Sequence, residues 1–343
     1  MKKVILDVLG GDNGAASTLQ GAILALKKDA ALNLVLVGDE AEIKKTINGF
    51  DGRVEIIHTT TNIGMNEHPA QAIRTKANSS ICLGMDALRT REDCTAFVSA
   101  GSTGAVLTGA FMKVGRIAGV SRPALAPILP VIKEKKTCPT AGVMVLDVGA
   151  NMDCKPQNLV HFAIMADRYM RAKGIPNPRI GLLSVGTEDE KGNELTLEAF
   201  KMLRALSTAQ SDSPLNFLGN MEARDTFSGK YDIVVTDGFA GNVLLKTLEG
   251  TGRLFSHELK RAISGVSVIL GKLILAGRLL KMKKQLGEDA TGGAIFLGIK
   301  KPVIKAHGNS NATAICNAIL VGAAAGDMNL SNEIEEAIKK SEQ

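Results

Sequence analysis

Residues 180–194 read Ile-Gly-Leu-Leu-Ser-Val-Gly-Thr-Glu-Asp-Glu-Lys-Gly-Asn-Glu. The apolar run at 180–185 stops at Gly186, which is typical of a buried strand leaving its sheet. The polar residues that follow form a loop with two glycines, one Lys and a cluster of acids, and helical spacing resumes over Leu195–Leu203. In an open α/β sheet, ligands bind at the loops that follow the carboxyl ends of strands. The stretch therefore predicts a strand, a ligand-binding loop and a helix.

Five other apolar runs end in a similar polar, glycine-rich way. Their ends are Asp7 with Gly10-Gly11, Gly101-Ser102-Thr103-Gly104, Asp147 with Gly149, Asp237-Gly238, and His307-Gly308. An Asp at a single such end is more often a helix cap or a loop organiser. Glycine, however, lets the backbone approach an anion closely, and a helix N-terminus attracts negative charge. Six such ends together indicate a phosphate or carboxylate site.

The whole chain alternates short apolar runs with helical patterns, which predicts an α/β fold with a mostly parallel sheet. A short strand pair is expected at residues 294–297 and 303–306. Pro123, Pro127 and Pro130 predict that Ala124–Ile132 is an irregular or edge strand, because proline cannot donate to a ladder. No Ser/Pro-rich linker divides the chain, so we expect one domain of two interleaved lobes over residues 1–343.

Composition excludes several classes of protein. Hydrophobic residues make up 45% and charged residues 22%, which is globular rather than disordered. The 3% aromatic content and the lack of Trp argue against nucleic-acid binding by stacking. The five cysteines are widely spaced without a C-x-x-C pair, which argues against a disulfide framework or zinc site and favours a reducing cytoplasm.

Familiar nucleotide, metal and hydrolase motifs are also missing. The sequence has no G-x-G-x-x-G, no complete P-loop, no H-E-x-x-H and no G-x-S-x-G. Glu188, Asp189 and Glu190 could bind Mg²⁺, but exposed loop acids are more often simply solvated. We therefore expect no metal and no nucleotide cofactor.

One segment, residues 251–287, carries the basic character of the chain. It holds a charge of +7 against a net +6 for the whole protein, with Glu258 as its only acid. Its basic residues are Arg253, Lys260, Arg261, Lys272, Arg278, Lys281, Lys283 and Lys284. Nine Val, Ile or Leu residues between 266 and 280 favour membrane insertion by roughly 3 to 5 kcal/mol, but Lys272 and Arg278 cost roughly 5 to 7 kcal/mol. The segment is thus either an amphipathic helix at a membrane surface or a helix packed on its own fold or on a dimer partner.

Eight sequence blocks, in order along the chain, resemble one known family. They are Asp7-x-x-Gly10-Gly11-Asp12, Ser99-Ala100-Gly101-x-Thr103-Gly104, Arg122-Pro123-Ala124, residues 146–151, residues 185–194, Gly219-Asn220-x-Glu222, Asp237-Gly238-Phe239-x-Gly241-Asn242 and Lys305-Ala306-His307-Gly308. The chain is similar to the PlsX phosphate acyltransferases of bacterial phospholipid synthesis. Asn13 stands where the family usually has His, and Ser102 where it usually has Asn.

The resemblance implies that a long-chain acyl group moves from acyl-carrier protein (ACP) to inorganic phosphate, giving acyl phosphate without a metal or cofactor. It implies a three-layer α/β/α fold with a mostly parallel mixed sheet, like isocitrate/isopropylmalate dehydrogenases and phosphotransacetylases, from which residues 251–287 protrude as a basic helical hairpin. It also implies a cytoplasmic homodimer in peripheral contact with the membrane, where a glycerol-3-phosphate acyltransferase uses the product. The basic segment would serve the membrane, the acidic carrier or both.

Phosphate can attack a thioester directly if it is held in line and the oxyanion is stabilised. A thiolate leaves readily because the pKa of a thiol is about 8.5, so no covalent enzyme intermediate is needed. We expect Lys191 and Lys305 to bind phosphate or the oxyanion, Asn242 and Asn151 to be neutral donors, and His307 to orient groups or transfer a proton. The residues expected to bind phosphate or substrate are Asp7, Gly10, Gly11, Gly101, Ser102, Thr103, Gly104, Asp147, Asn151, Gly186, Glu188, Gly192, Asp237, Gly238, Gly241 and Gly308.

Two other functions fit the same residues. The first is a phosphotransacetylase-like enzyme that acts on acyl-CoA, and the second is a non-catalytic scaffold at the membrane surface.

Overall fold

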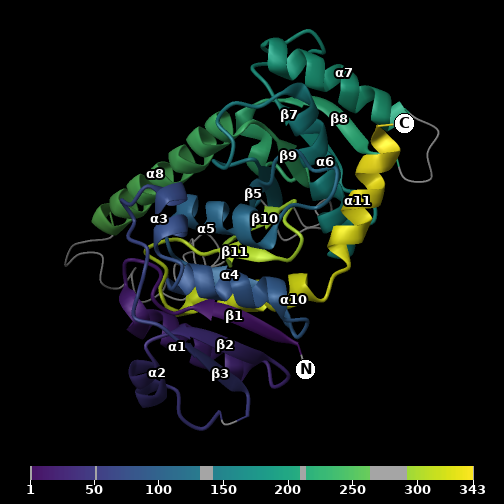
Figure 1. The fold of residues 1–343 in the computed structure, drawn as a ribbon. Helices are drawn as coiled ribbons and strands as arrows, with labels where there is room; N and C mark the ends of the chain where they lie inside the picture. The colour runs from purple at the N-terminus through teal and green to yellow at the C-terminus, as the bar shows by residue number, and fades with distance from the viewer. Residues whose placement is uncertain (1, 51, 132–141, 209–213, 263–291, 343) are drawn as a thin grey trace.

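The computed structural model describes residues 2–50, 52–131, 142–208, 214–262 and 292–342. Strands and helices alternate around a single sheet of eleven described strands (Figure 1). The strands are β1 Lys3–Asp7, β2 Asn33–Gly38, β3 Val54–His58, β4 Cys94–Ser99, β5 Ala124–Leu129, β6 Val143–Leu146, β7 Arg179–Leu183, β8 Asn216–Met221, β9 Ile233–Val235, β10 Ala294–Leu297 and β11 Val303–Lys305. The helices are α1 Gly14–Lys28, α2 Glu40–Thr46, α3 Pro69–Thr75, α4 Ser80–Thr90, α5 Thr103–Gly109 (continued by a π-helix, Ala110–Val114), α6 Pro156–Ala172, α7 Glu194–Thr208, a 3₁₀-helix Ala223–Phe227, α8 Gly238–Ala262, α10 Ala312–Gly326 and α11 Leu330–Ser341.

The sheet is mixed but mostly parallel, as the sequence predicted. Its strand order is β3-β2-β1-β4-β11-β10-β5-β6-β9-β7-β8. The first five strands of this order are parallel to one another, and so are the last four. The antiparallel pairs β11–β10, β10–β5 and β5–β6 lie between these two blocks. The two parallel blocks therefore run in opposite directions.

The strand β5 corrects one prediction, because it lies inside the sheet and is regular. It pairs with β10 from Ala124 to Pro127 and with β6 through Ile128 and Leu129. Pro127 thus stands where pairing passes from one neighbour to the other, so its missing N–H costs little. Composition alone cannot show this, because it depends on which strands arrive on either side.

Helices cover both faces of the sheet and give three layers. On one face, α1, α6, α7, α10 and α11 pack through one hydrophobic cluster that includes Leu19 and Phe162. On the other, α3, α4, α5 and part of α8 pack through a second cluster that includes Ile81. Val4 and Leu6 of β1 face the first cluster and Ile5 faces the second, as the alternation of a strand requires. This confirms the predicted α/β/α architecture.

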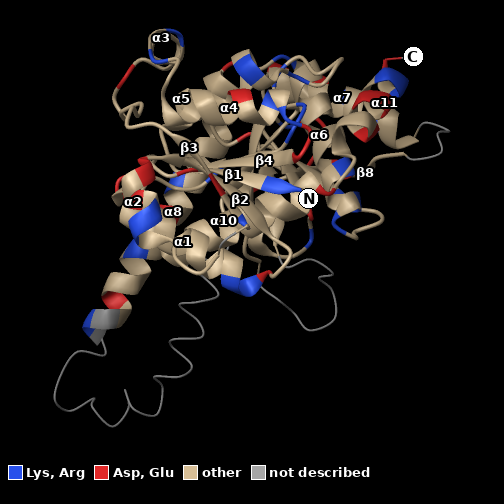
Figure 2. Cartoon of the chain, turned by 60° about the horizontal axis from the view of Figure 1, so that its bottom comes forward, with Lys and Arg blue, Asp and Glu red and all other residues tan. Residues whose placement is uncertain are grey.

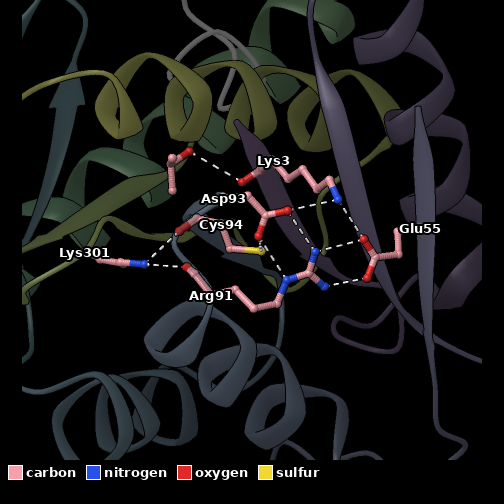
Figure 3. A network of polar contacts seen from close by, with 7 residues as sticks. Lys3, Glu55, Arg91, Asp93, Cys94 and Lys301 are labelled. Atoms are coloured by element: carbon pink, nitrogen blue, oxygen red, sulfur yellow. Dashed lines mark hydrogen bonds and ion pairs between the residues drawn. The ribbon is translucent and has the colours of Figure 1, made fainter. Parts of the chain in front are cut away.

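A network of charges holds together the edge of the sheet where β1 and β4 begin (Figure 3). The guanidinium of Arg91 donates to Glu55 at 2.9 Å and to Asp93 at 3.0 Å, and Lys3 Nζ contacts the same two carboxylates at 2.9 and 3.0 Å. Hydrogen bonds from Arg91 and then Lys3 lower the pKa of Glu55 to about 2. Nearby, Lys301 Nζ donates to three backbone carbonyls at 2.7, 2.8 and 3.0 Å. These contacts stabilise the amino-terminal ends of β1 and β4. The carboxyl ends of β1, β4 and β11 lie at the opposite end of these strands.

The outer turns of α8 project away from the rest of the described fold (Figure 2). Residues 250–258 of this helix are all exposed, and Arg253 and Arg261 are among its exposed basic residues. Of the other residues predicted to face a carrier or membrane, Lys260 has a described backbone only. Lys272, Arg278, Lys281, Lys283 and Lys284 lie outside the described residues, and so does most of the predicted hairpin.

Among the described residues, no single helix has the length and apolar composition to cross a membrane. The bent pair of α10 and α11 meets both criteria only when its two helices are taken together.

Candidate active site

The first cluster of predicted site residues lies at the ends of β1 and β4. Asp7 is buried, and its Oδ2 accepts a hydrogen bond from Ser99 Oγ at 2.7 Å, while Ser99 Oγ accepts from Gly101 N at 3.0 Å. A Cβ on Gly10 would lie 2.5 Å from Asp7 Oδ2, so only glycine fits there. Burial raises the pKa of the Asp7 carboxyl. Asp7 and Ser99 therefore link the loops that follow β1 and β4. The N–H of Gly101 already donates to Ser99 and is not free for a ligand.

Lys305, the last residue of β11, lies beside Ser99 in the ladder and is 7% exposed. Its Nζ donates to the carbonyls of Ala100, at 3.4 Å, and Ala306. The described residues place no carboxylate within ion-pair distance of this ammonium, and burial lowers its pKa to about 8, with Asp12 and Asp7 opposing that change. The predicted phosphate-binding Lys305 is thus a buried cation without a bound acid.

Glycines also join the loops that follow β1 and β11. Asp12 N donates to Gly308 O at 2.7 Å, and a Cβ on Gly11 would lie 3.0 Å from the same oxygen. Gly11 has φ +98°, which also favours glycine. The Lys305-Ala306-His307-Gly308 segment is thereby fixed against the Gly10-Gly11 turn.

The start of α5 follows directly and offers free backbone donors. In the described part of the chain, the N–H groups of Ser102, Thr103 and Gly104 have no acceptor. They lie within four residues of Ala100, whose carbonyl Lys305 contacts. Free N–H groups at a helix start carry the positive end of the helix dipole. Lys305 and these donors thus belong to consecutive parts of the same loop region, and their joint binding of phosphate stays a prediction.

The second cluster lies at the ends of β6 and β9. Asp147 Oδ1 accepts from Leu125 N, Gly149 N and Ala150 N at 2.9, 3.3 and 3.1 Å. Its Oδ2 accepts from Asn151 N at 2.6 Å and Asn151 Nδ2 at 2.9 Å. Burial raises the pKa of Asp147, with these donors opposing the change. Asp147 is therefore the organiser of this loop.

The side-chain amide of Asn151 is also used within the protein. Its Nδ2 donates to Pro123 O at 2.8 Å as well as to Asp147. Both amide hydrogens are therefore used, one within the loop and one to the residue before β5, and none remains for the predicted role of a donor to substrate.

The first turn of α8 packs on this loop with no side chain between them. Gly238 N donates to Asn151 O at 2.8 Å, and a Cβ on Gly241 would lie 1.9 Å from Asp147 O. Asp237 caps the helix by accepting from Ala240 N at 2.8 Å. The close packing places Asn242 beside Gly149 (3.7 Å from the position of a Cβ there), with no hydrogen bond of its own among the described residues. Within the described residues, Asn242 is therefore a free donor, unlike Asn151.

The helix α8 brings the two clusters together, although their strands run in opposite directions. Glu249, seven residues after Asn242, has its Oε1 3.8 Å from His307 Nε2 and its Oε2 2.8 Å from Lys246 Nζ. At a rise of about 1.5 Å per residue, Asn242 and Glu249 lie about 10 Å apart along the helix axis. The helix therefore contacts the second cluster through Asn242 and the loop after β11 through Glu249. That Asn242 and His307 serve one site stays a prediction.

The Gly186–Gly192 loop forms a third group, and Asn220 holds it in place. Asn220 Nδ2 donates to the carbonyls of Glu188 at 2.8 Å and Lys191 at 3.3 Å, and Gly192 has φ +137°. The side chains of Glu188 and Lys191 are exposed. No described contact joins Lys191 to Lys305 or Asn242, so its place at the site remains a prediction.

Three residues near the predicted groups were given no role from the sequence: Ser99, Lys246 and Glu249. Ser99 is hidden as the last residue of an apolar strand. Lys246 and Glu249 follow Asn242 at the i+4 and i+7 positions of α8, so all three share one helix face. That spacing was the signal that could have found them.

Two further features lie outside this site. A cavity of about 210 Å³ between the start of β4 and the connection from α10 to α11 is lined by none of the predicted site residues. Within the described ranges, no three His, Cys, Asp or Glu side chains are grouped as metal ligands.

Comparison with solved structures gives the fold class first. A phosphotransacetylase from Streptococcus pyogenes superposes with TM-score 0.60 at 17% identity, covering 94% of this chain and 93% of its own. EutD phosphotransacetylase from Staphylococcus aureus gives 0.59 at 15%, covering 95% and 94%. A 4-hydroxythreonine-4-phosphate dehydrogenase from Klebsiella pneumoniae gives 0.51 at 15%, covering 95% and 100%. The chain has the fold of the phosphotransacetylases and of related dehydrogenases, as predicted.

Sequence comparison then gives the family. A protein-family model described as "Fatty acid synthesis protein" matches residues 2–333 of this chain. A phosphate acyltransferase of Bacillus cereus (strain B4264) is 42% identical over 319 residues, which cover 92% of each chain. One from Geobacillus sp. (strain WCH70) is 41% identical over 344 residues, which cover 99% of each. The chain belongs to the PlsX family of phosphate acyltransferases, which confirms the predicted family and enzyme class.

Proposed function

We propose that this enzyme transfers a long-chain acyl group from acyl-ACP to inorganic phosphate, giving acyl phosphate for glycerol-3-phosphate acylation in phospholipid synthesis. The observation that carries this proposal is the ammonium of Lys305, 7% exposed and without an ion-pair partner in the described ranges. A buried charge is costly unless it is paired. Phosphate beside Lys305 and the first N–H groups of α5 supplies the missing negative charge.

The chemistry needs only positioning and electrostatic stabilisation. A phosphate oxygen attacks the thioester carbon, a C–O bond forms, and the carbonyl oxygen becomes an oxyanion that Asn242 and Lys191 stabilise. The C–S bond then breaks, and the thiolate of the carrier leaves and takes up a proton. His307 orients the phosphate or moves its proton. No covalent intermediate with the enzyme is formed.

The proposal extends to partners and location. The enzyme acts as a homodimer in the cytoplasm, in peripheral contact with an anionic membrane where a glycerol-3-phosphate acyltransferase consumes the product. Arg253 and Arg261 stand on the exposed outer turns of α8, where acidic ACP or anionic lipid can reach them. Exposed basic residues attract such partners at low salt.

A second candidate is a phosphotransacetylase-like reaction on acyl-CoA, favoured by the fold shared with two phosphotransacetylases. The deciding experiment incubates the protein with phosphate and either palmitoyl-ACP or acetyl-CoA. Acyl phosphate is measured by mass spectrometry, and free thiol by a colorimetric reagent. We expect acyl phosphate and free ACP in equal amounts from palmitoyl-ACP. Free thiol without acyl phosphate would mean hydrolysis, and product from acetyl-CoA alone would establish the second candidate.

A further inference from the structure

Glu249 on α8 occupies a position that the reaction scheme leaves without a role. Its carboxylate lies between two cationic or ionisable groups, Lys246 Nζ at 2.8 Å and His307 Nε2 at 3.8 Å. The Glu249 side chain is 11% exposed, compared with 55% for Lys246 and 42% for His307. Every residue from 250 to 258 on the same helix is exposed. Glu249 is therefore a charged residue of α8 whose side chain faces the loop after β11 and not the solvent.

Each oxygen of this carboxylate has its own partner. Oε2 faces Lys246, one helical turn earlier, and Oε1 faces His307. The other carboxylate near the loop is Asp12, whose Oδ2 lies 2.8 Å from the position of a Cβ on Gly308. No ion-pair contact to His307 is found for Asp12 within the described residues, so Glu249 is the acid that faces the imidazole.

We propose that Glu249 is a positioning residue, which holds the imidazole of His307 toward the phosphate site through Nε2. This rests on the proposed function, in which His307 orients phosphate or moves its proton. The separation of 3.8 Å is longer than a hydrogen bond, and such contacts in substrate-free enzymes are often long and tighten in the complex. Lys246 contacts the other oxygen at 2.8 Å, which favours the orientation in which Oε1 faces the ring.

A purely structural role makes a different prediction. Both partners of Glu249 are largely solvent-exposed, and pairs of that kind contribute about 0 to 1 kcal/mol to stability, so the loss of Glu249 is expected to leave the fold intact. If the carboxylate acts through His307, its removal lowers kcat and leaves the KM for phosphate nearly unchanged. Its effect also disappears once His307 is gone.

The experiment is a double-mutant cycle on the full-length enzyme with Glu249→Gln, His307→Gln and the double variant, assayed for acyl phosphate from palmitoyl-ACP. We expect Glu249→Gln to lower kcat about tenfold and to cause no further loss in the His307→Gln background. Glu249→Asp restores part of the rate. The matched control is Glu198→Gln, which breaks an i,i+3 pair with Lys201 (3.3 Å) on α7 and keeps the wild-type kcat.

A second readout does not depend on turnover. The side-chain ¹⁵N signals of His307, assigned by their loss in His307→Gln, shift in Glu249→Gln and not in Glu198→Gln. Unshifted signals, a wild-type kcat for Glu249→Gln, or an equal loss in both backgrounds would each overturn the proposal. If wild-type protein makes no acyl phosphate, the proposed function itself has failed, which is a separate result.

Discussion

Replacing Lys305 by Met tests whether a buried charge is kept for function at the expense of stability. Burial lowers the pKa of Lys305 to about 8 from 10.5, with Asp12 and Asp7 opposing. This lower pKa corresponds to about 3 kcal/mol against the charged form at neutral pH. Met removes this cost but leaves the carbonyls of Ala100 and Ala306 without their donor, at about 1 kcal/mol each. The variant should therefore be about 1 kcal/mol more stable at pH 7.

The pH dependence of stability has a definite sign. Because the folded protein holds this proton less tightly than the unfolded chain, wild-type stability rises between about pH 8 and 10.5 as the unfolded state keeps the proton longer. The advantage of Lys305→Met should therefore shrink as pH rises through that window. An unfolding entropy of about 0.7 kcal/mol/K for a chain of this length makes the expected gain in Tm at pH 7 only about 1 to 2 °C.

Calorimetry at pH 7 and pH 9.5 measures the effect of Lys305→Met on stability, and the acyl-phosphate assay measures its effect on activity. We expect Lys305→Met to lower kcat/KM for phosphate about a hundredfold or more, the scale of losing one stabilising donor at an active site, without lowering Tm. Lys301→Met is the matched control, because that lysine also donates to backbone carbonyls but at the opposite edge of the sheet. The control should lower Tm and leave the KM for phosphate unchanged. If Lys305→Met instead loses stability and keeps its activity, Lys305 is structural and the proposed phosphate site is misplaced.

Three further predictions follow from particular contacts. Gly241→Ala should cost about 3 kcal/mol in urea unfolding, since its Cβ would lie 1.9 Å from a carbonyl, whereas Gly250→Ala on the same helix meets nothing within 4 Å and should gain about 0.5 to 1 kcal/mol. Equal effects would show that α8 does not pack on the loop after β6. Arg91→Ala should cost about 1 kcal/mol at pH 7; because the folded pKa of Glu55 is about 2, below its ordinary 4.5, the difference should fade as pH drops from 4.5 toward 2. A pH-independent difference in unfolding would rule out the ion pair as its cause. Lys191→Ala should change stability by less than about 0.5 kcal/mol, because the side chain is exposed, and lower kcat/KM about tenfold or more; an unchanged rate removes Lys191 from the mechanism.

Local sequence was sufficient for the elements and the chemistry of their ends. The strand pair at residues 294–297 and 303–306 forms as predicted, to within one residue. The strand before Gly186 also forms, but it ends at Leu183 and leaves Val185 79% exposed. The glycines at 10, 238 and 241 were predicted to bind phosphate or substrate, and the structure shows a separate, steric reason for glycine at each. A Cβ at each would strike Asp7, Asn151 or Asp147, so these glycines allow loops to pack closely.

The roles of individual polar groups needed the structure. Asp147 and Asn151 lie at the end of a strand as predicted, yet their oxygens and amide hydrogens are used to build the loop itself. Asn242 has the same side chain as Asn151 and remains free within the described part of the chain. A sequence pattern shows which residues can donate, but only coordinates show which donors are already occupied.

The chain by itself therefore determined the α/β class, the polar strand ends and the family. Tertiary structure alone decided that β5 is interior, that the two parallel blocks run in opposite directions, and that α8 carries Asn242 to one cluster and Glu249 to the other. The physical reason is the sequence separation over which the deciding interactions act. Periodicity and turn chemistry act over a few residues, whereas strand order and the rotation of a helix depend on packing between segments far apart in the chain.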